Sequence, residues 1–399
     1  MKLLQTDIKN KVLQSMMTIL DRKREAIIAA NKKDLDLFDK SDRAMYDRLI
    51  VNDKKVDGMI QSIKEVMQQE DPVGKIKSER ILENDLKIQN KTAPFGTIMI
   101  IYESRPDVTI EAAVLAFKAN NKILLKGGKE AFHSNQILES CWHEALKENN
   151  LETDWIKLMH MNRAETQEFL KNPTEKLDLI VPRGGERLIA FVKEHAKCAV
   201  LISGRGNNFL YVSKDANWDQ SLKVILNAKT DKISACNALD KILVDTHIEG
   251  YDEKIKDLKK VLNDNGVSIL VDDKIGKILP NEEAIEDEAI WHQEFLAMKC
   301  CLGAVDSLDE AIQKINKYSG GHSATIMTTQ SNAAMEFMDQ VDSAAVYHNA
   351  STRFTDGGQM GVGAELAIST DKLHHRGPLG LEQLVTNKYY VFGDGQIRV

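Results

Sequence analysis

Of the five cysteines in this chain, one stands in a setting that suits a nucleophile. Cys236 lies in the small, polar stretch Ile233-Ser234-Ala235-Cys236-Asn237, between an expected helix over 221–228 and an expected strand. Small neighbours leave room for a substrate, and nearby backbone N–H groups can stabilise a developing oxyanion. The local sequence therefore makes Cys236 a candidate nucleophile, with a purely structural cysteine as the alternative.

The other four cysteines have apolar settings. Cys141 shares a helical pattern with Leu138 and Trp142, and Cys198 opens an apolar run that is typical of a strand. Cys300 and Cys301 are adjacent, so they cannot face one direction on a strand, and no second cysteine pair completes a zinc site. We expect all four to fill the core. Five cysteines are too few to form a disulfide framework in 399 residues, and an odd number leaves one of them unpaired.

Three sets of glycines mark expected strand-to-helix junctions: Gly127-Gly128, Gly184-Gly185, and Gly204 with Gly206. Such junctions direct backbone N–H groups and a helix N-terminus at a bound anion, as a dinucleotide requires. None of them matches G-x-G-x-x-G, so a tight turn is the favoured interpretation of each one alone. Only the three together make anion binding an equal alternative.

Two further segments are candidates for ligand contacts. His322 precedes an expected strand in Gly320-Gly321-His322-Ser323, where a structural role is the alternative. The glycine-rich stretch 349–363, which includes Arg353 and Asp356, follows a buried strand and predicts a ligand-contacting loop or a solvated one. His374-His375 have no partner spacing for a metal, and no metal site is predicted.

The elements that must position these residues alternate between strand and helix. Residues 8–70 predict helices, one of them with Asn52 as its N-cap. A buried strand is predicted at 97–102, and a parallel sheet covered on both faces follows from the alternation after it. The expected helices are 110–120, 134–148, 164–170, 186–195, 251–262, 308–317 and 332–338, and the expected strands are 122–125, 155–159, 177–181, 199–202, 242–244, 267–271, 324–327 and 344–347.

Composition limits the class of protein. The chain has 53 basic and 60 acidic residues, a net charge of −7, which gives no support for nucleic-acid binding. No apolar run approaches the roughly 18 residues of a membrane span, and charge appears too early for a secretory signal. We expect a reduced, cytoplasmic enzyme of two or three domains.

Several separated motifs together resemble one known family. They are Ala93–Gly96, Tyr102–Val108, Leu125–Glu130, Val181–Gly185, Asn227–Thr230, Ser234–Asn237, Asn349–Gly357, Gly377–Glu382 and Gly395–Arg398. From about Thr92 onward the chain is similar to the gamma-glutamyl phosphate reductase family of the aldehyde dehydrogenase superfamily. The resemblance implies an NADPH-dependent reduction of L-glutamate 5-phosphate to L-glutamate 5-semialdehyde in proline biosynthesis, through a thioacyl intermediate on Cys236.

The resemblance also implies a fold and its domains. We expect a Rossmann-type cofactor domain over 1–230, to which 350–383 returns, and a smaller α/β catalytic domain over 231–349. A small β element for homo-oligomerisation would combine 79–92 with 384–399. The implied partners are a small-molecule substrate, further copies of the chain, and a glutamate kinase that supplies the acyl phosphate, with neither a nucleic acid nor a membrane.

The resemblance assigns roles residue by residue. It implies Cys236 and Asn237 as catalytic, with Asn237 near the oxyanion. It implies a substrate site at Glu103, Arg105, Asp107, Arg353 and Thr355. It implies an NADP(H) site at Lys126, Lys129, Pro182, Arg183, Gly184, Gly185, Gly204 and Glu294.

Two local features bear on the chemistry. Hydrolytic relatives carry a glutamate before a glycine pair, and the matching segment, Val200–Gly206, has no carboxylate, as a reductase that must keep its thioester from water requires. Lys129 stands where NAD-preferring relatives often place a carboxylate, which favours a 2′-phosphate. Departures from the family's pattern at Ile233, Asn208-Phe209 and Ala324 leave two alternatives: a related enzyme acting on another acyl phosphate or aldehyde, and a non-catalytic NADP-binding protein.

Overall fold

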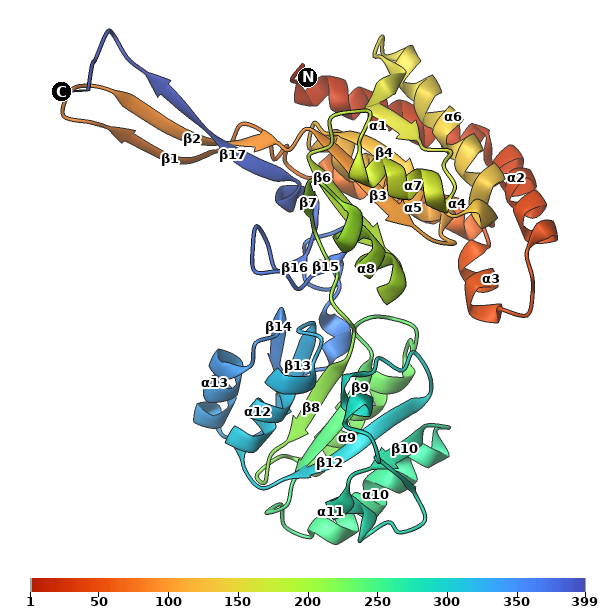
Figure 1. Cartoon of the computed structure of the whole chain (residues 1–399), viewed down its shortest axis with the longest axis vertical. Coiled ribbons are helices and arrows are strands. Elements are labelled where there is room, and N and C mark those ends of the chain that lie inside the picture. Colours follow the sequence, from red (N-terminus) through yellow and green to blue (C-terminus); the bar gives the residue numbers. More distant parts are fainter. Residues whose placement is uncertain (1, 399) are drawn as a thin grey trace. The chain divides into compact units, whose positions relative to one another are not determined.

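The computed structural model describes residues 2–398, apart from the side chains of residues 43, 44 and 186. The chain divides into two compact units. Unit 1 contains the residues up to Ile202, together with Gly361–Ala367 and the segment from Leu379 onward. Unit 2 contains Ser203–Met360 and Ile368–Pro378. Figure 1 shows the elements of both units.

Unit 1 is built on a parallel sheet with the strand order β5-β4-β3-β6-β7. The strands are β3 (Thr97–Tyr102), β4 (Lys122–Lys126), β5 (Ile156–Leu158), β6 (Leu179–Arg183) and β7 (Ala199–Val200). The helices are α1 (Thr6–Arg22), α2 (Arg24–Leu37), α3 (Arg43–Leu49), α4 (Asp53–Gln68), α5 (Pro106–Lys118), α6 (Phe132–Glu148), α7 (Arg163–Lys171) and α8 (Glu186–His195). Because all five strands run in one direction, their carboxyl ends meet at one edge of the sheet.

The two faces of this sheet carry separate cores. Ile98, Ile100 and Tyr102 of β3 pack with residues of α1, α4, α5 and α6, whereas Met99 and Ile101 pack with residues of α7 and α8. This alternation follows from the two-residue period of a strand. Asn52 caps α4 as predicted, since its Oδ1 accepts a hydrogen bond from the Lys55 N–H at 3.0 Å.

A second, three-stranded antiparallel sheet belongs to the same unit. It has the order β1-β2-β17 and joins β1 (Ile76–Ile81), β2 (Lys87–Pro94) and β17 (Val385–Phe392). Figure 1 shows these long strands extending from the body of unit 1. The segments 79–92 and 384–399, which were expected to combine, are therefore paired strands.

Unit 2 contains a larger parallel sheet with the order β11-β10-β12-β9-β8-β13-β14. Its strands are β8 (Asn208–Val212), β9 (Leu239–Asp245), β10 (Ser268–Val271), β11 (Glu283–Ala284), β12 (Lys299–Val305), β13 (Ser323–Met327) and β14 (Ala345–His348). The short strands β15 (Ile368–Ser369) and β16 (Gly377–Pro378) form an antiparallel pair. The helices are α9 (Trp218–Thr230), α10 (Tyr251–Asp264), α11 (Asp273–Gly276), α12 (Leu308–Tyr318) and α13 (Ser331–Gln340).

Adjacent cysteines show how the second sheet divides its cores. Cys300 of β12 packs on the face covered by α9 and α10, and Cys301 packs on the face covered by α12 and α13. Both are buried, as is Cys141, while Cys198 is half-buried just before β7. The expectation that these cysteines fill the core is confirmed for the three buried ones.

The predicted α/β class with parallel sheets is confirmed, but the sequence did not predict β8 or β12 as strands. The compact units meet in the chain at Ser203 rather than near residue 230, because β8 pairs with β9 and β13 and α9 packs on the same sheet. The segment 350–383 is also shared: 361–367 belongs to unit 1, and 368–378 belongs to unit 2. Among residues 2–398, no helix has the length and apolarity needed to cross a membrane.

Candidate active site

The structure places the predicted site residues in two sets. Unit 1 holds those at the carboxyl ends of its parallel strands, which are Glu103, Arg105, Asp107, Lys126, Lys129, Pro182, Arg183, Gly184 and Gly185. Unit 2 holds those around its sheet, which are Gly204, Cys236, Asn237, Glu294, Arg353 and Thr355.

Cys236 lies in the turn between α9 and β9, at the amino edge of the unit 2 sheet. The turn is closed by backbone hydrogen bonds from Ala235 N to Lys232 O at 3.1 Å and from Ala238 N to Ala235 O at 3.0 Å. Asn208, the first residue of β8, donates from Nδ2 to the carbonyls of Cys236 (2.8 Å) and Ala238 (2.7 Å). The half-buried thiol is therefore carried on a fixed backbone.

Gly206 and Glu294 lie beside this turn. A Cβ on Gly206 would overlap the Cys236 carbonyl and would lie within 2.5 Å of Glu294 Oε1. The absence of a side chain at Gly206 is thus what lets the backbone of Cys236 and the carboxylate of Glu294 approach the same point. Cys236 and Glu294 are 58 residues apart in the sequence, and the fold brings both of them beside Gly206.

Asn237 ties the Cys236 turn to the loop after β14. Its Nδ2 donates to the carbonyls of Arg353 (3.1 Å) and Thr355 (3.0 Å), and its own carbonyl accepts from Thr352 Oγ1 at 2.7 Å. The side-chain amide nitrogen of Asn237 is thus engaged with backbone carbonyls. The contacts make Asn237 an anchor that holds residues 352–355 against the cysteine turn.

A buried chain of hydroxyl groups lies behind this loop. Thr355 Oγ1 is hydrogen-bonded to Tyr347 OH (2.8 Å) and to Ser323 Oγ (2.7 Å), which is bonded in turn to His322 Nδ1 (2.7 Å). Burial lowers the pKa of His322 to about 4, so the imidazole is neutral. The side chains of Thr355 and His322 point into the protein, and within this unit they support the loop.

The same loop forms one wall of a cavity of about 310 Å³. Arg353 lies in it, and its Nε donates to Asp231 Oδ2 at 3.0 Å across the cavity lining. The lining residues are Asn227, Asp231, Arg353, Phe354, Asp356 and Gln359. A guanidinium beside carboxylates and amides can bind a small polar substrate. Part of the 349–363 stretch thus lines the cavity, and part of it is held by Asn237.

Unit 1 presents a polar edge where β3, β4 and β6 end. Lys126 is the last residue of β4, and burial lowers its pKa, while Lys129 is exposed in the short helix η1 (Lys129–Ala131) that follows. A Cβ on Gly127 would overlap the Asn135 amide, so a glycine is required there for packing. Gly185 precedes α8, and a Cβ on it would meet nothing within 4 Å.

These features fit the phosphates of a nucleotide. Two lysines and the N-terminus of a ten-residue helix lie at one sheet edge, and the approach to Gly185 is open. Pro182 is buried within β6, while Arg183 ends that strand and Gly184 is exposed next to Glu103. The edge can therefore hold an anionic ligand.

Glu103, Arg105 and Asp107 span the turn between β3 and α5. Asp107 is buried and accepts from Lys55 Nζ at 2.7 Å and from Arg105 at 3.1 Å. Burial alone would raise the pKa of Asp107, but the charges of Arg105 and Lys55 hold it at about 2. Asp107 is therefore an ion-pair centre that orients Arg105, whereas Glu103 is exposed.

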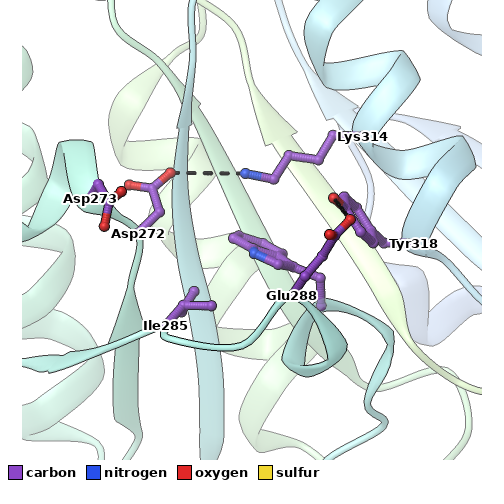
Figure 2. A pocket seen from close by; sticks show the side chains of 7 residues that line it. Asp272, Asp273, Ile285, Glu288, Lys314 and Tyr318 are labelled. Carbon is purple, nitrogen blue, oxygen red and sulfur yellow. Dashed lines mark hydrogen bonds and ion pairs between the residues drawn. The ribbon is translucent and has the colours of Figure 1, made fainter.

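A second cavity in unit 2, of about 250 Å³, has a different lining (Figure 2). Lys314 Nζ lies 3.9 Å from Asp272 Oδ2 and 3.9 Å from the centre of the Trp291 ring. Tyr318 donates from its hydroxyl to Glu288 at 2.6 Å. Its charged groups already face one another, and it contains none of the predicted site residues.

Sequence reasoning missed three charged residues close to the Cys236 turn. Lys229, Asp240 and Lys241 are buried, although lysine and aspartate are rarely enclosed. The pattern Leu239-Asp240-Lys241-Ile242 offered one signal, since two charges interrupt an otherwise apolar strand.

Comparison with known proteins gives consistent results. A model of the aldehyde dehydrogenase family matches residues 282–365. The gamma-glutamyl phosphate reductase of Dictyoglomus thermophilum is 39% identical, over 100% of this chain and 96% of its own. That of Enterococcus faecalis is 40% identical, over 99% of this chain and 95% of its own.

Solved structures agree with these relatives. The crystal structure of gamma-glutamyl phosphate reductase from Thermotoga maritima has a TM-score of 0.94 and 39% identity, covering 99% of this chain and 95% of that one. An acetylating aldehyde dehydrogenase from Geobacillus thermoglucosidasius shares the fold at a TM-score of 0.68 and 17% identity, covering 99% and 94%.

The two parallel sheets, with a cysteine turn at the amino edge of the second, define an oxidoreductase of the aldehyde dehydrogenase fold. Sequence identity near 40% over the whole chain, shared with the relatives named above, narrows this class to a single family. The chain belongs to the gamma-glutamyl phosphate reductase family.

Proposed function

We propose that this protein reduces L-glutamate 5-phosphate to L-glutamate 5-semialdehyde and releases phosphate, a step of proline biosynthesis. The observation that carries the proposal is the Cys236 turn, in which Gly206, Asn208 and Asn237 fix the backbone of a half-buried cysteine. Family membership supplies the substrate class. A glutamate kinase would supply this labile acyl phosphate.

In the proposed mechanism the Cys236 thiolate attacks the acyl carbon of the substrate. The C–S bond forms first and gives a tetrahedral intermediate. The C–O bond to phosphate then breaks, and phosphate leaves with its electron pair. The Cys236 N–H, with the N–H groups of the turn, stabilises the oxyanion of the tetrahedral intermediate. In unit 2, Arg353 can bind a charged group of the substrate. In unit 1, Asp107 orients Arg105, which lies with Glu103 after β3.

We propose NADPH as the reductant. When bound, NADPH supplies the two electrons that convert the thioester on Cys236 to the aldehyde. Lys126, the backbone around Gly184 and Gly185, and the α8 N-terminus would hold its phosphates, and Lys129 would favour a 2′-phosphate. Glu294 would accept hydrogen bonds from the nicotinamide ribose hydroxyls. Val200–Gly206 offers no carboxylate to activate water, so the thioester persists until it is reduced.

The test follows NADPH formation from NADP⁺, phosphate and glutamate 5-semialdehyde. Wild type should turn over only when phosphate is present, and Cys236→Ser should lose at least about 10³-fold of kcat, the scale for removal of a covalent nucleophile. Phosphate-independent turnover would identify an aldehyde dehydrogenase instead. Binding of NADPH without turnover of any aldehyde would identify a binding protein, and activity retained by Cys236→Ser would refute the thioacyl step.

We also propose that the β1-β2-β17 sheet joins copies of this chain. It exposes a group of large apolar side chains, namely Ile76, Ile81, Tyr389, Val391 and Phe392. Exposed apolar groups on paired long strands are typical of a protein interface. Sedimentation should show an oligomer that Val391→Lys dissociates, and a monomeric wild-type protein would contradict the proposal.

A further inference from the structure

Three buried charges in unit 2 take no part in the mechanism proposed above. Lys229 is the penultimate residue of α9, and Asp240 and Lys241 lie near the start of β9. The exposed fraction of Lys229 and Lys241 is 0%, and that of Asp240 is 2%. Removing charged groups from water is costly, and a hydrophobic pair of similar volume is often at least as stable. Their presence therefore calls for a role other than stability alone.

The contacts of these residues converge on one segment. Lys229 Nζ donates to Asp240 Oδ1 at 2.8 Å, and Asp240 Oδ2 accepts from the Phe295 N–H at 2.9 Å. Lys241 Nζ donates to the Gln293 carbonyl at 2.7 Å and lies 3.9 Å from the centre of the Phe295 ring. The two strand residues thus hold the backbone on either side of Glu294.

This segment has no regular structure of its own. It joins the short helix η3 (Glu288–His292) to β12, and Leu296 has a φ of +51°, in the left-handed region that a leucine rarely adopts. Asn207 adds a third anchor, because its Nδ2 donates to the Trp291 carbonyl at 2.7 Å. A strained, irregular segment keeps one conformation only where surrounding contacts impose it.

We propose that Asp240 and Lys241 are positioning residues that fix Glu294 beside Gly206 and Cys236, with Lys229 orienting Asp240. The inference rests on the proposed contact of Glu294 with the nicotinamide ribose, and it explains how an irregular segment presents that carboxylate. Loss of either anchor lets the segment relax, so the ribose contact is lost while the Cys236 turn, closed by its own hydrogen bonds, remains.

The test compares Asp240→Asn and Lys241→Met with Glu294→Gln. Each should weaken binding of NADPH by roughly tenfold, the scale of one charge-assisted hydrogen bond, when binding is titrated through the fluorescence of the reduced nucleotide. The double variants with Glu294→Gln should bind no more weakly than Glu294→Gln alone, because all three substitutions remove one interaction. Michaelis constants for NADPH should rise in the same proportion.

The matched control is Asp245→Asn. Asp245 is also buried on β9, but it accepts from Tyr211 OH (2.7 Å) and His247 N (2.9 Å) and holds no part of the Glu294 segment. It should lower the melting temperature without changing NADPH binding. Should Asp240→Asn fail to fold, Lys241→Met decides, since methionine keeps the length and packing of the side chain.

Three outcomes overturn the positioning proposal. If the Lys241→Met/Glu294→Gln double variant loses NADPH affinity by the product of the two single losses, Lys241 acts elsewhere. If Asp245→Asn weakens NADPH binding as much as Asp240→Asn does, the effect is a general one of buried charge. If Glu294→Gln itself binds NADPH like the wild type, the proposed ribose contact is wrong and the positioning role fails with it. The Cys236→Ser assay, which does not depend on Glu294, judges the proposed reaction separately.

Discussion

His322 makes the stability of unit 2 depend on pH. The side chain is fully buried, and burial is the cause that lowers its pKa from 6.5 to about 4. The Nε2 atom forms no hydrogen bond to any residue in the described part of the chain. A proton added to the folded protein would therefore create a buried imidazolium whose Nε2–H has no hydrogen-bond partner among the described residues.

The sign and size follow from linkage. The folded-state pKa is depressed, so the unfolded state takes up the proton first as the pH falls. The stabilisation is complete above pH 6.5 and is lost as the pH approaches 4. Between pH 7 and pH 5 the free energy of unfolding should fall by about 2 kcal/mol through this group alone.

The assay compares wild type with His322→Asn, which keeps a polar side chain and removes the titration. Urea unfolding can be followed for unit 2 alone in a Trp142→Phe/Trp155→Phe background, because the remaining tryptophans, Trp218 and Trp291, both lie in that unit. All other titrating groups are shared, so the difference between the two proteins isolates His322. Equal losses of stability from pH 7 to pH 5 in both proteins would refute the reasoning.

Three further predictions concern other residues. Gly206→Ala should reduce turnover more than tenfold, because its Cβ would displace the Cys236 backbone. The control, Gly276→Ala, should leave turnover unchanged, since a Cβ there has its nearest neighbour at 3.8 Å. Equal turnover by the two variants would contradict the predicted overlap at Gly206. Iodoacetamide at pH 8 should label Cys236 in the native protein, as read by peptide mass spectrometry. Burial raises the pKa values of Cys141, Cys300 and Cys301 to about 11, 12 and 11, so these thiols should react only after unfolding. Rapid labelling of Cys300 in the native protein would contradict this prediction. Asp107→Asn should lower the free energy of unfolding by about 2 kcal/mol at pH 7, because the ion pairs hold the folded-state pKa of Asp107 at about 2, below its ordinary value. The difference from wild type should vanish as the pH falls from 4 to 2. A difference that is independent of pH would exclude the ion pairs as its origin.

The alternation of strand and helix was readable from the sequence because the parallel strands are short, apolar and regularly spaced. β8 and β12 escaped prediction for different reasons. β8 begins with Asn208, a residue typical of turns, whose side chain here bonds the Cys236 turn. In β12 the adjacent cysteines argued against a single buried face, but the strand has cores on both faces, so both cysteines are buried.

The site was only partly predictable. Cys236 was a candidate from its small neighbours and its motif, and the resemblance named Glu294 without indicating that it would lie beside the Cys236 turn. The roles of Asp240 and Lys241 were not predictable, because hydrogen bonds from β9 to a segment more than 50 residues later leave no periodic trace in the sequence. The sequence indicated that Thr355 and His322 are polar, but it did not indicate that buried hydrogen bonds through Ser323 would link them.

The chain order of the two units has a consequence for synthesis. Unit 2 is almost continuous, so its sheet can form as soon as β14 leaves the ribosome. Unit 1 takes Leu366, Leu379, Leu384 and Val385 into the core that holds β3 and β4, and β2 stays an open edge until β17 pairs with it. The first residues translated therefore complete their fold after the middle ones, and for most of elongation an unpaired strand edge is open to nascent chains nearby. We expect chains that end between residues 378 and 385 to contain all of unit 2 but to depend on chaperones for unit 1.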